Sequence, residues 1–190
     1  LLHTFVDTNA GSLPMGSLIL DGSETLYGVM TAGGSSNSGT VFSLNTDGSL
    51  FQVLYPFAGF SSDGGYPWAS LIPDGSGYVY GTTSYGGLGY RGTVYRIRSD
   101  GTGFQLLHAF SGGANDGDVP RAPLILDRAG NLYGTTINGG PSNRGTVFKL
   151  RKDGTSFQLL HTFLGGAGDG SGPVSGLILD GADNLYGTTS

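Results

Sequence analysis

Short runs of β-type residues, each bounded by turn residues, follow one another between Pro67 and Phe110. Asp74-Gly75 and Asp100-Gly101 lie between such runs, where Asp-Gly is a strong hairpin signal. The pattern predicts four strands, at residues 69–72, 78–83, 92–98 and 104–110. In the third run apolar and polar residues partly alternate, which predicts one covered face and one wet face. No window has a capped helical period, so no helix is expected.

The arrangement recurs every 53 residues, as the tyrosines at 27, 80, 133 and 186 show. A fixed period of this size is typical of a propeller, a solenoid or an array. Solenoid coils are usually shorter and seldom contain two Asp-Gly hairpins. We therefore predict an all-β fold: a β-propeller-like tandem repeat with four antiparallel strands per 53-residue blade and about three and a half blades. Gly81, Gly134 and Gly187 follow tyrosines in the second strand, where a missing side chain lets a neighbouring ring or backbone come close.

The phase of the repeat predicts one repeat domain over residues 1–190. Its units are expected at 14–66, 67–119 and 120–172, with a partial unit at 173–190 and the last strand and loop of a preceding unit at 1–13. Leu1–Phe5 match the fourth strand of the other units and could join the trailing first and second strands. The third strand of that blade would still be missing. We expect that either further chain or another subunit supplies it, because an unpaired edge is a template for pairing.

The composition of the chain argues against several classes of protein. Glycine is 37 of 190 residues but recurs at fixed places beside aromatic and aliphatic residues, which argues against disorder. The net charge of −5 is spread through turns and the nine Lys and Arg form no stripe, so nucleic-acid binding is not expected. No apolar run approaches the ~18 residues of a membrane span. Only 12% of residues are charged and there is no Cys. A surface of Ser, Thr, Asn and Gly favours an extracellular or cell-surface location.

The combined motifs resemble those of a known family. Tyr133-Gly134-Thr135-Thr136, Gly139-Gly140, Gly145-Thr146-Val147-Phe148 and Leu106-Leu107-His108-Ala109-Phe110 are similar to the GloVer (Gloeo_Verruco) tandem repeat of exported and surface-anchored bacterial proteins. The resemblance covers essentially the whole chain and implies a propeller-forming extracytoplasmic protein, with no catalytic residues to carry over. The first copy departs from the pattern, since Val29-Met30 replaces Thr-Thr. Doubled glycines also occur in kelch repeats, but the spaced Trp and Tyr of kelch blades are absent.

Two sets of residues are candidates for a metal or acid–base site. His3, His108 and His161 share one repeat position, with Tyr55 in the remaining copy, and a structural role on the outer strand is the alternative interpretation. Asp63, Asp116 and Asp169 begin Asp-Gly loops, and Asp118 adds a second carboxylate in one copy. Oxygen ligands of this kind suit Ca²⁺, while turn formation is the competing explanation. No other cofactor is expected.

Residues that break the repeat are candidates for ligand binding, because the shared scaffold does not require them. They lie in the loops of the second copy: Tyr66, Trp68, Tyr85, Tyr90 and Arg91. Exposed aromatic rings with an arginine can stack on a sugar ring or contact a surface protein. The alternative is local packing beneath a long loop.

These observations favour a non-enzymatic structural repeat protein that self-associates through its incomplete terminal blade as a homo-oligomer, ring or filament. A glycan- or protein-binding propeller that uses the loop aromatics is the second hypothesis. A propeller enzyme acting on polysaccharide is third, because acid–base catalysis needs a positioned pair of groups and every repeated Asp has a turn explanation.

Overall fold

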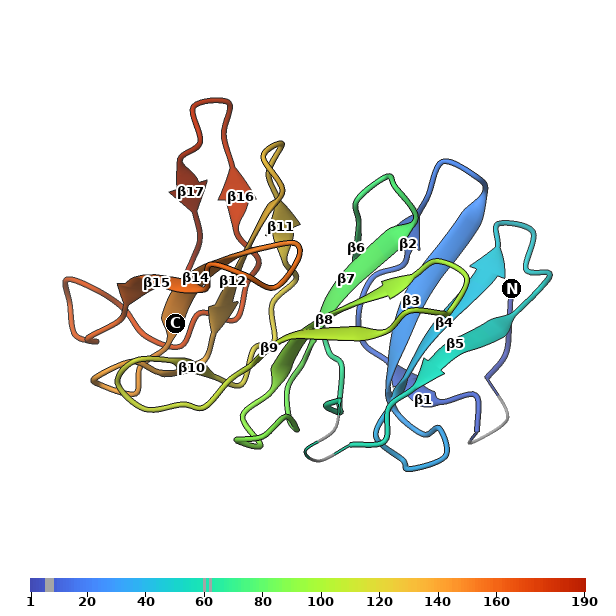
Figure 1. Ribbon diagram of the computed structural model, residues 1–190, viewed down its shortest axis with the longest axis horizontal. Helices are drawn as coiled ribbons and strands as arrows, with labels where there is room; N and C mark the ends of the chain where they lie inside the picture. The colour runs from blue at the N-terminus through green and yellow to red at the C-terminus, as the bar shows by residue number, and fades with distance from the viewer. Residues whose placement is uncertain (6–8, 60, 62) are drawn as a thin grey trace.

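The computed structural model describes residues 1–5, 9–59, 61 and 63–190, and all regular structure in that part of the chain is β. Three antiparallel sheets follow the repeat, and we call them blades one to three (Figure 1). Blade one contains β2 (Ile19–Leu20), β3 (Thr25–Ala32), β4 (Thr40–Asn45) and β5 (Gln52–Pro56). Blade two contains β6 (Ile72–Pro73), β7 (Tyr78–Thr83), β8 (Thr93–Arg98) and β9 (Gln105–Ala109). Blade three contains β11 (Ile125–Leu126), β12 (Asn131–Thr136), β14 (Thr146–Arg151) and β15 (Gln158–Thr162).

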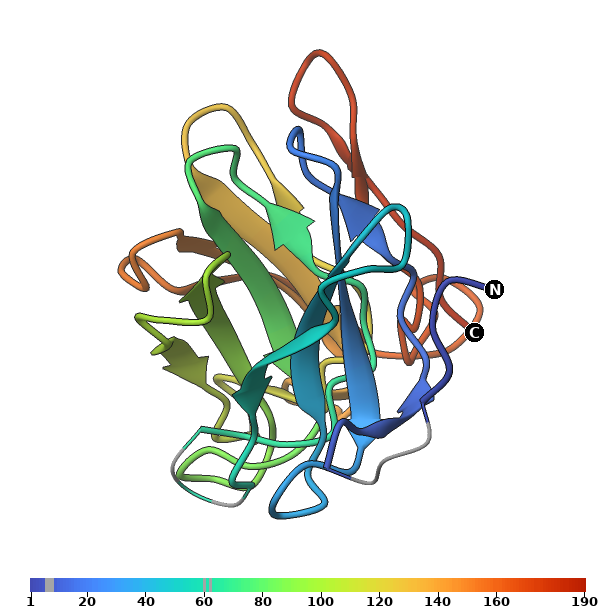
Figure 2. The same cartoon turned by 90° about the vertical axis from the view of Figure 1, so that its right-hand side faces the viewer.

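A fourth blade is begun by β16 (Ile178–Leu179) and β17 (Leu185–Tyr186). The all-β propeller-like fold is confirmed, and the first strands are shorter than expected, with two residues each. Figures 1 and 2 show that the hairpins joining first and second strands all project from one end of the molecule. The two termini lie far apart along the longest axis, so the blades form an open row (Figure 1). Within the described residues, no helix is long and apolar enough to cross a membrane.

Each complete blade also has a short pairing at its loop end that the sequence pattern does not predict. The loop before the first strand pairs with the end of the second strand. In blade one β1 (Ser12–Pro14) pairs with β3, and in blade three β10 (Gly117–Asp118) pairs with β13 (Asn138–Gly139). In blade two the same pairing is a single bridge between Gly65 and Tyr85. Residues expected to be loose loops are therefore held by backbone hydrogen bonds.

The strand register is the same in each complete blade. Gly134 of β12 faces Phe148 of β14, and Gly81 of β7 faces Tyr95 of β8. A Cβ atom on Gly134 would lie 2.6 Å from the Phe148 ring, well inside normal carbon contact. Glycine is required here because the ring of the adjacent strand lies over the backbone, as the sequence predicts.

The hydrophobic core lies between blades. One buried cluster joins blades one and two, and another joins blades two and three. In β8, Tyr95 and Ile97 belong to the first cluster and Val94 belongs to the second. Residues on both faces are buried, but Arg96 is half-buried and Arg98 is exposed, so the predicted wet face is found only at the end of the strand. The reason is that a blade is packed between two neighbours, which local alternation does not reveal.

Residues 1–5 cover the outer face of blade one. The Phe5 ring lies edge-on to Phe42 and Phe51, with centroids 5.4 and 5.6 Å away. The predicted strand is not formed in this segment, which has no regular secondary structure. A fourth strand pairs with the third strand of its own blade, and the described residues offer none to this segment. Ring contacts hold it instead.

Candidate functional site

The contacts between blades are built on aromatic rings. The His108 ring of β9 lies parallel to Phe157 of blade three, with centroids 3.8 Å apart. Beside it the buried Phe110 meets Phe148 edge-on at 5.2 Å. Stacked and edge-to-face arrangements are the geometries that aromatic pairs prefer. In this set of contacts, two rings at the fourth strand of one blade pack against rings of the next blade. We call the set an aromatic joint.

The joint is repeated along the chain. Tyr55 lies parallel to Phe104 at 4.1 Å between blades one and two, and His3 lies parallel to Phe51 at 4.2 Å between residues 1–5 and blade one. Each repeat histidine or tyrosine therefore belongs to a different joint. Among the described residues no three His, Cys, Asp or Glu side chains come together as a group that could hold a metal ion.

An aspartate holds the ring of the fourth strand in each of the three blades. Oδ1 of Asp116 lies 3.1 Å from Nε2 of His108, and Oδ2 accepts hydrogen bonds from the amide and hydroxyl of Ser111 at 2.8 and 2.9 Å. Burial raises the pKa of Asp116, but the hydrogen bonds from His108 and Ser111 outweigh it, so the pKa lies below its ordinary value. The carboxylate stands between the histidine and the serine. A catalytic triad needs the histidine in that place, so this is not the arrangement of a triad.

The aspartates predicted as calcium ligands are distributed over these joints. Asp63 accepts a hydrogen bond from the Tyr55 hydroxyl at 2.9 Å, and Asp169 lies 2.8 Å from Nε2 of His161. Asp118 is buried, and its Oδ2 accepts a hydrogen bond from Arg91 at 2.6 Å. Its Oδ1 is buried with no hydrogen-bond partner in the described part of the chain. Calcium binding stays a prediction, and any ion would have to compete with these contacts.

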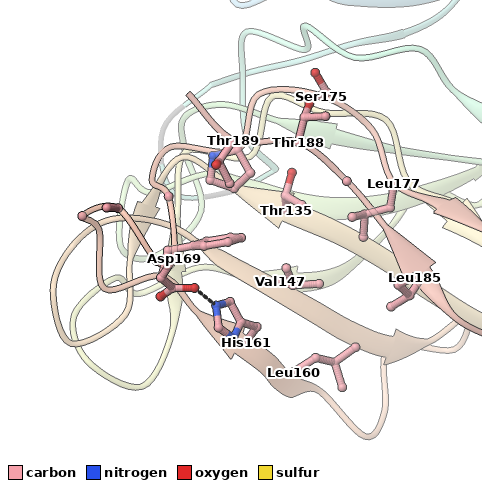
Figure 3. A pocket seen from close by; sticks show the side chains of 17 residues that line it. Thr135, Val147, Leu160, His161, Asp169, Ser175, Leu177, Leu185, Thr188 and Thr189 are labelled. Atoms are coloured by element: carbon pink, nitrogen blue, oxygen red, sulfur yellow. Dashed lines mark hydrogen bonds and ion pairs between the residues drawn. The ribbon is translucent and has the colours of Figure 1, made fainter.

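The last joint is open. A cavity of about 740 Å³ lies between blade three and the begun fourth blade. Figure 3 shows Leu160 and His161 on one side of it and Leu177 and Leu185 on the other. His161 keeps its bond to Asp169 and its edge-on contact with Phe163 at 4.7 Å. Half of the joint is therefore formed, and among the described residues no ring lies parallel to His161 as Phe157 does to His108.

The structure brings three of the predicted binding residues together. Tyr66, Tyr85 and Tyr90 line one cavity of about 270 Å³ at the loop end of the joint between blades one and two. The Tyr66 and Tyr85 rings meet edge-on with centroids 5.8 Å apart. Trp68 does not line this cavity, since its ring lies under the guanidinium of Arg121 at 4.9 Å. Arg91 is likewise outside the cavity lining and pairs with Asp118.

Comparison with known families settles the class of repeat. The pattern of the Gloeobacter/Verrucomicrobia repeat matches residues 1–190. The chain belongs to this repeat family. The resemblance of its motifs to the Gloeobacter/Verrucomicrobia repeat is thereby confirmed for the whole chain.

Two solved structures show the fold of this Gloeobacter/Verrucomicrobia repeat protein by similarity. A chain of a nidogen/laminin complex is 19% identical with a TM-score of 0.62, over 90% of this chain and 54% of that one. TolB from Acinetobacter baumannii is 14% identical with a TM-score of 0.52, over 88% of this chain and 36% of that one. Both are propeller folds, and this chain spans about half or less of their length. None of the curated proteins compared with it matches.

Sequence reasoning missed a second bond that the Gloeobacter/Verrucomicrobia repeat uses. The aspartate of the first hairpin accepts a hydrogen bond from the repeat tyrosine, as Asp127 does from the Tyr133 hydroxyl at 2.9 Å. The pairs Asp21–Tyr27, Asp74–Tyr80 and Asp180–Tyr186 repeat it. Hydrogen bonds from Asn184 lower the pKa of Asp180 to about 2. The constant spacing of six residues between these partners was the available signal.

Proposed function

We propose that the chain is a non-enzymatic structural protein of the cell surface or extracellular space that self-associates through its incomplete fourth blade. The open joint carries this proposal. Leu160 is 41% exposed although the equivalent Leu107 is 8% exposed, and His161 faces the cavity instead of a stacked ring. A joint with one half formed presents a surface shaped for the other half.

A second copy of the chain suits this surface. Blade one carries the ring-bearing face that fills a joint, with Phe51 and Phe42, and residues 1–5 cover it by side-chain contacts without strand pairing. Exchange of residues 1–5 between copies would join the open end of one molecule to blade one of the next. Such a head-to-tail contact is heterologous and gives a ring or a filament.

We propose the absence of catalysis because the candidate histidines and aspartates are already engaged in contacts within the fold. Each histidine–aspartate pair fixes a ring at a joint, and hydrogen bonds occupy the carboxylates of Asp116 and Asp169. The location is proposed from the sparse charge of the sequence and its Ser-, Thr-, Asn- and Gly-rich polar residues. Fractionation of cells that make the protein tests the location, and cytoplasmic recovery would contradict it.

Self-association is tested by light scattering on the purified chain across a concentration series, with negative-stain images. The expected mass is two or more times the 19.5 kDa of one chain. Leu160→Asp places a charge in the open joint and should give the monomer. Leu88→Asp, at a loop residue that is 85% exposed and outside this cavity, is the matched control and should assemble like the parent chain. A parent chain that stays monomeric at every concentration contradicts the proposal.

A further inference from the structure

The three tyrosines at the joint between blades one and two are not needed to form the repeat fold. Tyr66, Tyr85 and Tyr90 are 41%, 45% and 55% exposed around their cavity. Blades one and three form the same loops with other residues at these positions. The equivalents are Leu13 and Val119 for Tyr66, Ala32 and Asn138 for Tyr85, and Asn37 and Asn143 for Tyr90. The rings therefore serve something other than the shared fold.

Two of the three tyrosines have a backbone conformation that is unfavourable for a bulky residue. Tyr66 has φ 57° and Tyr90 has φ 55°, both in the left-handed region. Bulky side chains are strained there, whereas Asn is tolerated. Asn143 shares this conformation in blade three, and its Oδ1 accepts a hydrogen bond from the Gly139 amide at 2.9 Å. At the Tyr66 position the other blades share the left-handed backbone, with Leu13 at φ 59° and Val119 at φ 57°, so the conformation there belongs to the repeat. At the Tyr90 position the other blades carry Asn, so the tyrosine is the strained departure, and strained residues of this kind gather at functional sites.

The cavity is formed in advance by backbone bonds. Gly65 and Tyr85 exchange two backbone hydrogen bonds, at 2.9 and 3.1 Å. The Tyr66 amide donates to the Ser38 carbonyl of blade one at 2.7 Å, which fixes the loop across the joint. Because the backbone that carries these rings is already held, little backbone freedom remains to be lost when a ligand binds.

The lining indicates the chemical class of the ligand. Besides the tyrosines, the described residues that line it are Ser36, Ser38 and glycines, and none of these is charged. Its polar side-chain groups are hydroxyls, each able to donate and to accept a hydrogen bond. The nearby Arg91 is already paired with Asp118. A sugar ring matches this surface, with C–H faces for the aromatic rings and a rim of hydroxyls.

We propose that Tyr66, Tyr85 and Tyr90 form a binding site for a neutral carbohydrate, one sugar ring lying against the tyrosine rings. This goes beyond the assembly role, because the site lies between blades one and two and does not involve the open joint. The two proposals can therefore fail separately. Leu160→Asp protein can serve as the binding sample if the parent chain assembles.

The test is calorimetric titration with four neutral hexasaccharides: cellohexaose, maltohexaose, xylohexaose and mannohexaose. At least one is expected to bind. Tyr85→Asn and Tyr90→Asn introduce the residues that blade three carries at these positions, so both variants should fold. Each should weaken binding at least tenfold, and the double variant should abolish it. Trp68→Met, with the residue that blade one carries, is the matched control and should bind within twofold of the parent.

Several results would overturn this assignment. One is the absence of binding by all four sugars at millimolar concentration. Another is sugar binding that survives the double tyrosine variant or is lost with Trp68→Met.

Discussion

The joint after blade two and the joint after blade three have the same local parts but different surroundings. His108 and His161 each pair with an aspartate and lie edge-on to a phenylalanine, with the same 4.7 Å centroid distance. The His108 side chain is 19% exposed beneath the Phe157 ring, while the His161 side chain is 48% exposed. We call the pairing of a fourth-strand ring with its aspartate the aspartate lock. The lock is formed within one unit, whereas the histidine is buried only where the next blade covers it.

This difference shows how a repeat of this kind divides its stability. The bonds within one unit set the shape of the fourth strand, while most apolar burial lies in the clusters that two units share. Stability in repeat proteins is approximately a sum of unit terms and interface terms. Identical residues in successive blades should then differ in energetic importance according to whether the interface beside them is filled.

The strongest test compares Phe110→Ala with Phe163→Ala. Phe110 is fully buried in the joint between blades two and three. Its removal should cost about 3–4 kcal/mol, the usual range for a buried ring. Phe163 lies at the open joint, so its removal should cost about 1 kcal/mol. Urea unfolding followed by circular dichroism measures both. Equal losses would mean that burial at the joint does not govern stability.

The aspartate lock predicts how stability depends on pH. The folded pKa of Asp116 is lowered, so this carboxylate stabilises the fold above its unfolded pKa of about 3.9, and the contribution is lost as pH falls through the folded value. Asp116→Asn should cost about 2 kcal/mol at pH 7, because hydrogen bonds to a charged group are lost. Its stability should change less than that of the parent between pH 7 and pH 3.

The matched variant for the lock is Asp169→Asn at the open joint. Its pKa is also lowered, by hydrogen bonds from the Leu164 amide and from His161, but the pair is exposed to solvent. Its effect at pH 7 should be clearly smaller than that of Asp116→Asn. If the two variants lose equal stability, the covering blade does not strengthen the lock. Urea titrations at both pH values decide the point.

The period of 53 residues was enough to predict the blades, because hairpin signals and strand runs are local. β7 was predicted at its observed bounds, 78–83. The joints were not predicted, since His108 and Phe157 lie 49 residues apart and nothing in either neighbourhood indicates that they meet. The recurrence of Phe51, Phe104 and Phe157 in step with the fourth-strand rings was the unused signal.

The candidate binding residues could likewise be predicted only in part. Departure from the repeat identified all three tyrosines of the cavity, but it also selected Trp68, which packs against Arg121 of the next blade. Arg91 was selected although Arg144 occupies the same position in blade three. The loop pairing across the joint determines which of the residues that break the repeat share a cavity. Sequence spacing does not reveal this pairing.

A smaller effect distinguishes the joint between blades one and two from the joint between blades two and three. Tyr95 occupies the position of Phe148, and its hydroxyl is buried with no hydrogen-bond partner among the described residues. Burial raises the pKa of Tyr95, so the group stays neutral. Tyr95→Phe should stabilise the protein by about 1 kcal/mol, because an unsatisfied buried hydroxyl is removed. Phe148→Tyr should cost about as much. A destabilised Tyr95→Phe would reveal a partner for the hydroxyl, and thermal unfolding measures both variants.

The smallest expected effect extends the comparison to the loops beside the joints. Tyr90 and Asn143 share one repeat position and a left-handed backbone, at φ 55° and 51°. Tyr90→Asn should stabilise the protein by about 0.5 kcal/mol, because Asn tolerates this conformation and can accept a hydrogen bond from the Gly86 amide as Asn143 does from Gly139. Asn143→Tyr should destabilise it by a similar amount. Thermal unfolding of the two variants measures the strain, and a Tyr90→Asn protein less stable than the parent would mean that the tyrosine is retained for packing and not for a ligand.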